Sequence, residues 1–341
     1  MTALVLAGIL PAVVAFATIA ALRGSAWAHR LSDHPNSRSL HSAPTARIGG
    51  IGIAAALAPV ALLAPGAGFA AIAACAAALF VVSLADDHRG LPIQVRLPAH
   101  FAAAAVVVLA LADGSTWPWG WPGTLLVVLA IAWATNLYNF MDGADGLAGG
   151  MGLIGFGALA IAAGRSGQPS LALACVAIAS ACAGFLPHNF PPARVFLGDC
   201  GAIPLGFLAG ALGLAGTVSG AWPEWFAPLV FSPFVADATV TIALRILRRE
   251  RFWIAHRTHA YQQLVLAGWS KRRLAASAWI LMAAAAGSAL VAREAGGNGA
   301  CVILFVWLAA YAVLFAAVRW LTRRKALAAR VDTDPTPRMP E

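Results

Sequence analysis

The chain has 341 residues, of which 60% are hydrophobic and only 11% are charged. A soluble domain carries about 25% charged residues, so this composition excludes a water-soluble globular enzyme, and the high hydrophobicity excludes a disordered chain. What remains is a polytopic membrane protein, in which a net charge of +9 reflects basic residues that face anionic membrane lipid and requires no nucleic acid.

Apolar runs long enough to cross a bilayer as helices follow one another along the chain. The first run lacks the basic residues that begin a signal peptide, so we expect it to be retained. We therefore predict an all-α polytopic membrane protein with about eleven transmembrane helices. The expected spans are 3–22, 48–64, 67–85, 95–112, 121–138, 147–164, 169–186, 201–218, 225–246, 274–292 and 300–320.

The distribution of basic residues sets the predicted orientation. If the N-terminus lies outside, only Arg165 and Arg293 of the 23 lysines and arginines fall in outside loops, which obeys the positive-inside rule. We therefore expect an outside N-terminus and a cytoplasmic C-terminus. One transmembrane catalytic domain is expected over residues 1–322, followed by a polar, disordered cytoplasmic tail over 323–341.

Acidic residues are costly at membrane depth, so those that flank the spans are informative. Five of them come from three separate loops on the predicted cytoplasmic side: Asp86, Asp87, Asp142, Asp145 and Asp199. The adjacent pair alone is weak evidence, because a solvated helix end explains it equally well. Their common face predicts that all five belong to one site.

The stretch 136–150 carries the strongest signal, because it places two asparagines, two aspartates and four glycines between apolar spans. Carboxylate and amide oxygens suit a hard cation such as Mg²⁺, and glycines let the backbone approach a ligand closely. The alternative is an ordinary Asx/Gly turn, but such a turn needs only about four residues. We therefore expect Asn139, Asp142 and Asp145 to contribute to the site.

A proline-rich segment, 187–198, leads into the eighth span, and Asp199 begins that span. An acid at this position suits the positive end of a helix, so a capping role is the alternative to a functional one. Phe196 is placed to stack on a base, or is simply an interfacial aromatic side chain.

Two further segments bring cations to the same side. His256 and His259 share one face if their segment is helical, and with the nearby arginines, Arg257 among them, they form a cationic patch suited to a diphosphate. A positive-inside anchor explains the arginines but not the histidine pair. Arg47, followed by a Gly-Gly pair at the start of the second span, is suited to holding a phosphate at a helix N-terminus.

Carboxylates, a divalent cation and cationic side chains at the membrane surface indicate phosphoryl transfer from a soluble donor to a membrane-held acceptor. An ion-coupled transporter is the main alternative, but it would place its acids near the membrane midplane. An intramembrane aspartyl protease needs two facing catalytic acids, and a membrane scaffold leaves the carboxylates unexplained.

Five ordered motifs also resemble those of a known family: HSAPTARIGG (41–50), DDHRGL (86–91), NLYNFMDGADGLA (136–148), NFPPARVFLGDCG (189–201) and HRTHAYQ (256–262). They are similar to the motifs of the polyprenyl-phosphate N-acetylhexosamine-1-phosphate transferases, the glycosyltransferase-4-type membrane enzymes. The last motif is most similar to the branch that initiates O-antigen-type polysaccharides. Ala46, Ile48 and Ala202 stand where the family usually has Pro, Gly and Ser.

The resemblance implies an enzyme of the bacterial inner membrane with a cytoplasmic active site, which uses a UDP-N-acetylaminosugar, undecaprenyl phosphate and Mg²⁺, with Mn²⁺ as an alternative ion. It implies metal ligation by Asp199 and Asp142 and catalytic roles for Asp86, Asp87, His256 and His259. It implies nucleotide or substrate binding by Arg47, Asn139, Asp142, Asp145, Asn189, Phe196 and Arg257. The oligomeric state is left open, with a homodimer as one alternative.

Overall fold

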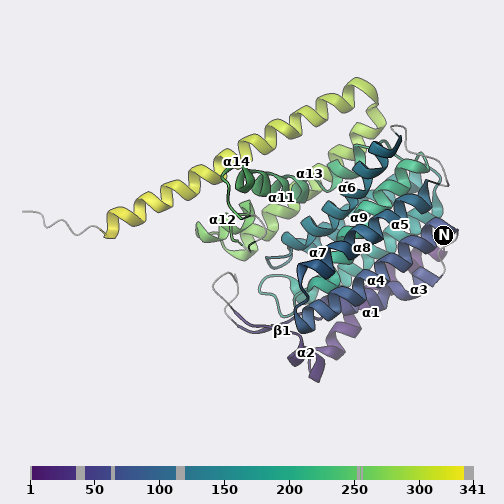
Figure 1. Ribbon diagram of the computed structural model, residues 1–341, viewed down its shortest axis with the longest axis horizontal. Helices are drawn as coiled ribbons and strands as arrows, with labels where there is room; N and C mark the ends of the chain where they lie inside the picture. The colour runs from purple at the N-terminus through teal and green to yellow at the C-terminus, as the bar shows by residue number, and fades with distance from the viewer. Residues whose placement is uncertain are drawn as a thin grey trace, which may run out of the picture.

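The computed structural model describes residues 2–35, 43–62, 66–112, 120–251, 254 and 256–333, and its regular structure is almost entirely helical (Figure 1). The longer helices are α1 (Thr2–Leu22), α3 (Gly49–Leu62), α4 (Ala67–Arg89), α5 (Ile93–Leu111), α6 (Gly120–Phe140), α7 (Leu147–Arg165), α8 (Pro169–Asn189), α9 (Asp199–Val218), α11 (Ser232–Leu247), α13 (Lys271–Ala295) and α14 (Gly297–Thr333). Three short helices join them: α2 (Ala26–Arg30), α10 (Phe226–Val230) and α12 (Ala260–Leu266). The predicted all-α polytopic class is confirmed.

Eight helices of the described chain are long and apolar enough to cross a membrane, namely α4, α5, α6, α7, α8, α9, α13 and α14. Two shorter apolar stretches, Leu6–Leu22 and Gly49–Ala61, coincide with the first two expected spans. The total of eleven and the orientation of the termini stay predictions.

The ninth expected span, 225–246, is not one continuous helix. It consists of α10, which ends at Val230, and α11, which begins at Ser232 with Pro233 in its first turn. Proline has no N–H to give to a preceding carbonyl and is favoured in the first turn, so Pro233 starts a new helix instead of continuing the old one.

The most buried helices, α7, α8 and α9, form the centre of the bundle, where Phe156, Phe185 and Phe207 are completely buried. Glycines allow the neighbouring helices to approach this centre closely. A Cβ on Gly184 would collide with the carbonyl oxygen of Ala12 in α1, and one on Gly206 would lie 2.6 Å from the carbonyl oxygen of Ala134 in α6. Small residues at such crossings give the close packing on which helix association in membranes depends.

The two ends of the bundle carry different charges. Asp145 lies just before α7 at one end, and Arg165 is the last residue of that helix at the other. Arg165 and Arg293 both approach Glu294, at 3.9 Å and 2.6 Å respectively. The two basic residues that the charge pattern places outside therefore gather at the end opposite the acidic loops.

Helix α14 extends well beyond the bundle (Figure 1) and continues to Thr333. The expected tail from residue 323 therefore overlaps α14, and its disorder stays a prediction. Residues 334–341, and His41 and Ser42 of the first motif, lie outside the described residues.

Candidate active site

The C-terminal end of α4 meets the N-terminal end of α9, and Asp87 joins them. Its carboxylate accepts hydrogen bonds from the backbone N–H groups of Asp199 (3.1 Å) and Cys200 (2.9 Å), and its side chain is fully buried. Gly198, with φ of +77°, allows this approach, because a Cβ there would lie 2.9 Å from an Asp87 oxygen. Asp87 therefore caps α9 from another helix and sets the position of Asp199.

A small antiparallel ladder positions Arg47. Strands β1 (Ser32–Asp33) and β2 (Thr45–Ala46) pair with each other, and Ala46 also bridges to Val195 in the segment before α9. Arg47 follows directly, with its guanidinium 2.6 Å from an oxygen of Asp33 and 3.6 Å from one of Asp87.

The Gly-Gly pair after Arg47 attaches the start of α3 to the same segment. The N–H groups of Gly49 and Gly50 donate to the carbonyl oxygens of Phe196 (3.0 Å) and Leu197 (2.8 Å). A Cβ on Gly50 would collide with the backbone of Gly201 in α9. These N–H groups are occupied by the protein itself, so they do not form the phosphate-binding helix end that the sequence suggested.

Arg96, near the start of α5, contacts the carboxylates of both Asp86 and Asp199. It lies 2.8 Å from an oxygen of Asp86 and 3.6 Å from one of Asp199, and the second oxygen of Asp86 accepts the N–H of Leu91 at 2.5 Å. Among the described residues the Nε of Arg96 is buried with no hydrogen-bond partner. Sequence reasoning missed Arg96; the available signal was an arginine just inside the span that follows the acidic pair.

Asp142 lies in the connection between α6 and α7 and is partly buried. Burial, followed by the negative charges of Asp199 and Asp87, raises the pKa of the Asp142 carboxyl well above its ordinary value, against a smaller opposing effect of Arg47. The structure thus brings Asp142 into the electrostatic field of the α4–α9 junction. Asn139, one turn earlier in α6, is half-buried, and its carbonyl oxygen accepts the N–H of Asp142.

Asp145 and Asn189 are buried in contacts that hold the loops together. Asp145 accepts the N–H of Ala193 (3.0 Å) and pairs with Lys271 at the start of α13 (3.0 Å). Asn189 accepts the N–H of Gly146 (2.8 Å) and donates to the carbonyl oxygen of Val195 (2.9 Å). Both were expected at the nucleotide, whereas the structure engages their side chains within the protein; Lys271 was missed because it is remote in sequence.

The histidine motif is held by Asp237 of α11, a buried residue to which sequence reasoning gave no role. Asp237 lies 3.3 Å from His259 and accepts the backbone N–H groups of Ala260 (2.9 Å) and Tyr261 (3.2 Å) at the start of α12. Tyr261 donates its hydroxyl to the carbonyl oxygen of Phe140 (3.0 Å). The histidine motif is therefore fastened to the loop that carries Asp142.

His256 and His259 do not share a helix, because α12 begins only at Ala260, yet their rings lie 5.0 Å apart. Burial lowers the pKa of His256 to about 4, with further lowering by His259 and Arg245. This environment favours the neutral ring of His256, which hydrogen-bonds to Thr258, whereas the sequence pattern counted His256 in a cationic patch.

The remaining expected residues lie at the edges of this arrangement. Phe196 is half-buried and uses its backbone to hold β2 and α3. Arg257 is half-buried, and its carbonyl oxygen accepts the side-chain amide of Gln263. The structure therefore gathers the acidic pair, Asp142 and Asp199 in one region, with the histidine motif attached beside it.

The chain is similar in sequence to several known proteins. The model of glycosyl transferase family 4 matches residues 69–217, which include all five aspartates. The decaprenyl-phosphate N-acetylglucosaminephosphotransferase of Mycolicibacterium smegmatis is 30% identical over 79% of this chain and 77% of its own. The probable undecaprenyl-phosphate N-acetylglucosaminyl 1-phosphate transferase of Bacillus subtilis is 30% identical over 70% of this chain and 71% of its own. The phospho-N-acetylmuramoyl-pentapeptide-transferase of Moorella thermoacetica is 31% identical over 59% of this chain and 69% of its own.

The chain belongs to the polyprenyl-phosphate N-acetylhexosamine-1-phosphate transferases. It is a multi-pass membrane enzyme that transfers a sugar phosphate. Arg47 and the histidine motif lie outside the matched range, so the structure, not the family model, brings them to this transferase's carboxylates.

The transferase offers a partial set of ligands for Mg²⁺. Within the described ranges no group of three or more His, Cys, Asp or Glu side chains is arranged to hold a metal. Mg²⁺, however, is commonly held by one or two carboxylates together with substrate phosphates and water. Asp142, whose carboxyl is destabilised as an anion by Asp199 and Asp87, fits this pattern because a cation would relieve the repulsion. The residues therefore fit a cation whose coordination the substrate completes.

Proposed function

We propose that the transferase moves an N-acetylaminosugar-1-phosphate from a UDP-sugar to undecaprenyl or another polyprenyl phosphate. The products are a polyprenyl-diphosphate sugar and UMP. N-acetylglucosamine is the first donor to test, because two relatives that share most of this chain's length are named for it. The reaction starts O-antigen or a related cell-envelope polysaccharide.

The observation that carries this proposal is the junction of α4 with α9, where Arg47 lies beside Asp87 and Arg96 lies beside Asp199. Asp87 fixes the start of α9 through two hydrogen bonds, while Arg96 approaches Asp199 to 3.6 Å. Both anionic and cationic groups therefore meet at one end of the bundle. A diphosphate needs the cations for its charge and the carboxylates for the metal that accompanies it.

Arg47 and Arg96 are the groups that hold the phosphates, because guanidinium groups bind phosphate oxygens through paired hydrogen bonds. Arg96 has an unpartnered, buried Nε within the described structure, so it has donor capacity left for a substrate. His256 and His259 would donate or accept hydrogen bonds at the sugar or phosphates. Asp142 and Asp199 would hold Mg²⁺, which when bound neutralises charge on the diphosphate.

The two residues of the acidic pair take positioning roles in this proposal. Asp87 already accepts two backbone N–H groups, and Asp86 is occupied by Arg96 and the N–H of Leu91. A carboxylate so engaged is a poor nucleophile, which favours direct attack by the acceptor phosphate on the donor's β-phosphorus. The bond to the UMP oxygen then breaks, and UMP leaves with that electron pair. A phosphomonoester with a second pKa near 6 is largely ionised at neutral pH, so it needs no strong base.

The acceptor lies in a membrane and the donor in the cytosol, so the acidic end of the bundle is proposed to face the cytoplasm of a bacterial inner membrane. The basic-residue distribution supports this orientation. An ion-coupled transporter is less well supported, because Asp237, within α11, is occupied in holding α12.

The experiment supplies purified protein with undecaprenyl phosphate, Mg²⁺ and, one at a time, the UDP forms of N-acetylglucosamine, N-acetylfucosamine and N-acetylquinovosamine. Lipid-linked sugar and UMP should form in equal amounts, and only when lipid and metal are both present. Glu224→Gln is the matched control and should keep full activity, because Glu224 lies in the connection after the C-terminal end of α9, away from the Asp199 end of that helix. UMP release that does not depend on lipid would contradict the proposal.

A further inference from the structure

Six exposed cations lie at one end of α13 and α14, on the side of the bundle that carries the acidic loops. They are Arg272, Arg273, Arg319, Arg323, Arg324 and Lys325. The neighbouring Lys271 pairs with Asp145, but none of the six forms an ion pair with a carboxylate that the structure describes. The sequence contains no Asp or Glu from 251 to 293 or from 295 to 331, so this cationic cluster carries uncompensated positive charge.

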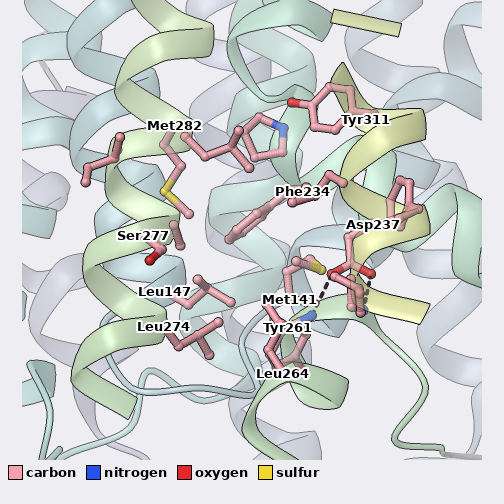
Figure 2. Close-up of a pocket in the computed structure, with 18 of the residues that line it drawn as sticks. Met141, Leu147, Phe234, Asp237, Tyr261, Leu264, Leu274, Ser277, Met282 and Tyr311 are labelled. Carbon is pink, nitrogen blue, oxygen red and sulfur yellow. Dashed lines mark hydrogen bonds between the residues drawn. The ribbon is translucent and has the colours of Figure 1, made fainter. Parts of the chain in front are cut away.

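A contact between α12 and α14 brings the two parts of the cationic cluster together. Lys325 in α14 donates to the carbonyl oxygen of Leu266 at the end of α12, at 3.0 Å. Trp269, in the turn before α13, and Val318 of α14 both line the apolar cavity that Figure 2 shows. The turn before α13 and the basic part of α14 therefore form one surface, although they are far apart in the sequence.

Each part of the cationic cluster holds an arginine against a tryptophan ring. The Arg273 guanidinium lies 4.0 Å from the centre of the Trp269 ring, and the Arg324 guanidinium lies 4.6 Å from that of Trp320. Tryptophan is enriched where a membrane meets water. Stacking fixes the plane of a guanidinium but leaves the N–H groups at its edge for another ligand. In the described structure neither guanidinium donates to a protein oxygen, so both keep donors for an anion.

The surface of α14 that leads to the cationic cluster is apolar and exposed. Phe305, Leu308 and Val313 are 75%, 68% and 69% exposed, and α14 is the least buried of the eight candidate spans. This helix then continues beyond the bundle through the basic residues (Figure 1). A ligand that combines an anionic headgroup with hydrocarbon chains matches both parts of this surface.

We propose that the cationic cluster binds the headgroup of an anionic glycerophospholipid, with Arg273 and Arg324 at its phosphate and its acyl chains beside the exposed side of α14. Clusters of about four to eight basic residues at the end of a spanning helix attract anionic lipid. A general attraction of basic loops to the membrane accounts for the number of cations. It does not account for two arginine–tryptophan pairs that meet from separate segments. The site requires no sugar-phosphate transfer, so this proposal is independent of the proposed function.

Thermal unfolding of the purified full-length protein in detergent tests the site. Phosphatidylglycerol should raise the melting temperature in a saturable way, whereas phosphatidylcholine, which has no net charge, should not. In Arg273→Gln/Arg324→Gln the phosphatidylglycerol concentration at half-maximal effect should rise about thirtyfold, because each cation at a membrane surface contributes about fivefold to the affinity for anionic lipid. Arg273→Lys/Arg324→Lys keeps the charge but loses the planar stacked groups, so its value should lie between those of the wild type and the glutamine variant.

Arg23→Gln/Arg30→Gln is the matched control. It removes two exposed arginines from the segment after α1, at the same end of the bundle, and should respond to phosphatidylglycerol as the wild type does. Native mass spectrometry counts bound phosphatidylglycerol without unfolding the protein, and Arg273→Gln/Arg324→Gln should retain fewer molecules than the control. Equal loss of affinity in the two double variants would show attraction without a site and would overturn the proposal.

Two competing ligands distinguish a phospholipid from other sources of phosphate. Inorganic phosphate at the same concentrations should leave the melting temperature unchanged, and stabilisation equal to that by phosphatidylglycerol would contradict a lipid site. Undecaprenyl phosphate in equimolar amount should not displace phosphatidylglycerol, and complete displacement would assign the cationic cluster to the acceptor instead. Specific retention of phosphatidylglycerol by a protein that is inactive with every UDP-sugar would support the site and count against the proposed function.

Discussion

Asp87 in α4 and Asp199 in α9 are joined by a hydrogen bond from the backbone N–H of Asp199 to the carboxylate of Asp87, at 3.1 Å. The bond makes the placement of one aspartate depend on the other. It also divides their roles, because the Asp87 side chain is fully buried while that of Asp199 keeps 25% exposure. The two are therefore expected to respond differently to the same substitution.

Asp87→Asn should lower both stability and activity. An amide has one acceptor oxygen, so one N–H at the start of α9 loses its partner, at a cost of about 1–3 kcal/mol. Displacement of Asp199 should reduce kcat roughly a hundredfold, as small displacements at reacting centres do. Thermal unfolding in detergent and steady-state kinetics measure the two effects. An unchanged melting temperature would contradict the capping role.

Asp199→Asn should abolish turnover and leave the melting temperature nearly unchanged. Its carboxylate forms a 3.6 Å ion pair with Arg96 but also lies beside the like-charged Asp86 and Asp87, so folding depends little on its charge, whereas the proposed metal site loses a charged ligand. Activity measured against Mg²⁺ and Mn²⁺ concentration tests this. Near-normal activity at saturating metal would remove Asp199 from the metal site.

Arg96→Met should reduce kcat/KM for the donor roughly a hundredfold or more, the effect of losing one charge-stabilising donor. Arg96→Lys keeps the charge but cannot reach Asp86 and Asp199 through one planar group, so it should recover only part of the activity. If the lysine and methionine variants are equally impaired, geometry outweighs charge. Full activity of Arg96→Met would exclude a role at the phosphates.

Lys271→Met should destabilise the protein without removing its chemistry. It leaves the Asp145 carboxylate buried with only the N–H of Ala193 as a partner, and because Lys271 is 30% exposed we expect a loss of about 1–3 kcal/mol, less than for a fully buried pair. Activity below the melting temperature should stay within a few-fold of the original. A double substitution with Asp145→Asn should be less destabilising than the sum of the two single changes. Loss of donor binding at full stability would instead place Asp145 at the nucleotide.

His256 predicts a pH dependence of stability. Because its folded-state pKa is lowered to about 4 by burial and by His259, the folded protein favours the neutral ring. The resulting stabilisation is fully present above the unfolded value near 6.5 and is lost as the pH falls toward 4. The melting temperature should therefore fall more steeply over this range in the wild type than in His256→Asn. Identical slopes would show that the ring is protonated freely in the folded state.

Composition and the order of apolar runs determined by themselves that this is a helical membrane protein, because only long apolar helices satisfy their backbone groups in a bilayer. The pattern of acids also predicted that Asp86, Asp142 and Asp199 would meet, since charge is tolerated only near the ends of such helices. Pro233 is a signal for a break in the sequence, but the continuous apolar run around it favoured a single span.

Only the tertiary structure decided what each polar side chain does. In the sequence, Asp87 and Asp145 cannot be told apart from catalytic carboxylates. In the structure, Asp87 caps a helix that begins 112 residues later, and Asp145 pairs with Lys271, 126 residues later. Arg96 and Asp237 carried no motif, yet each organises part of the site. A residue's type limits the hydrogen bonds it can form, whereas its partners and its exposure to water are set by helices that approach only when the whole chain folds.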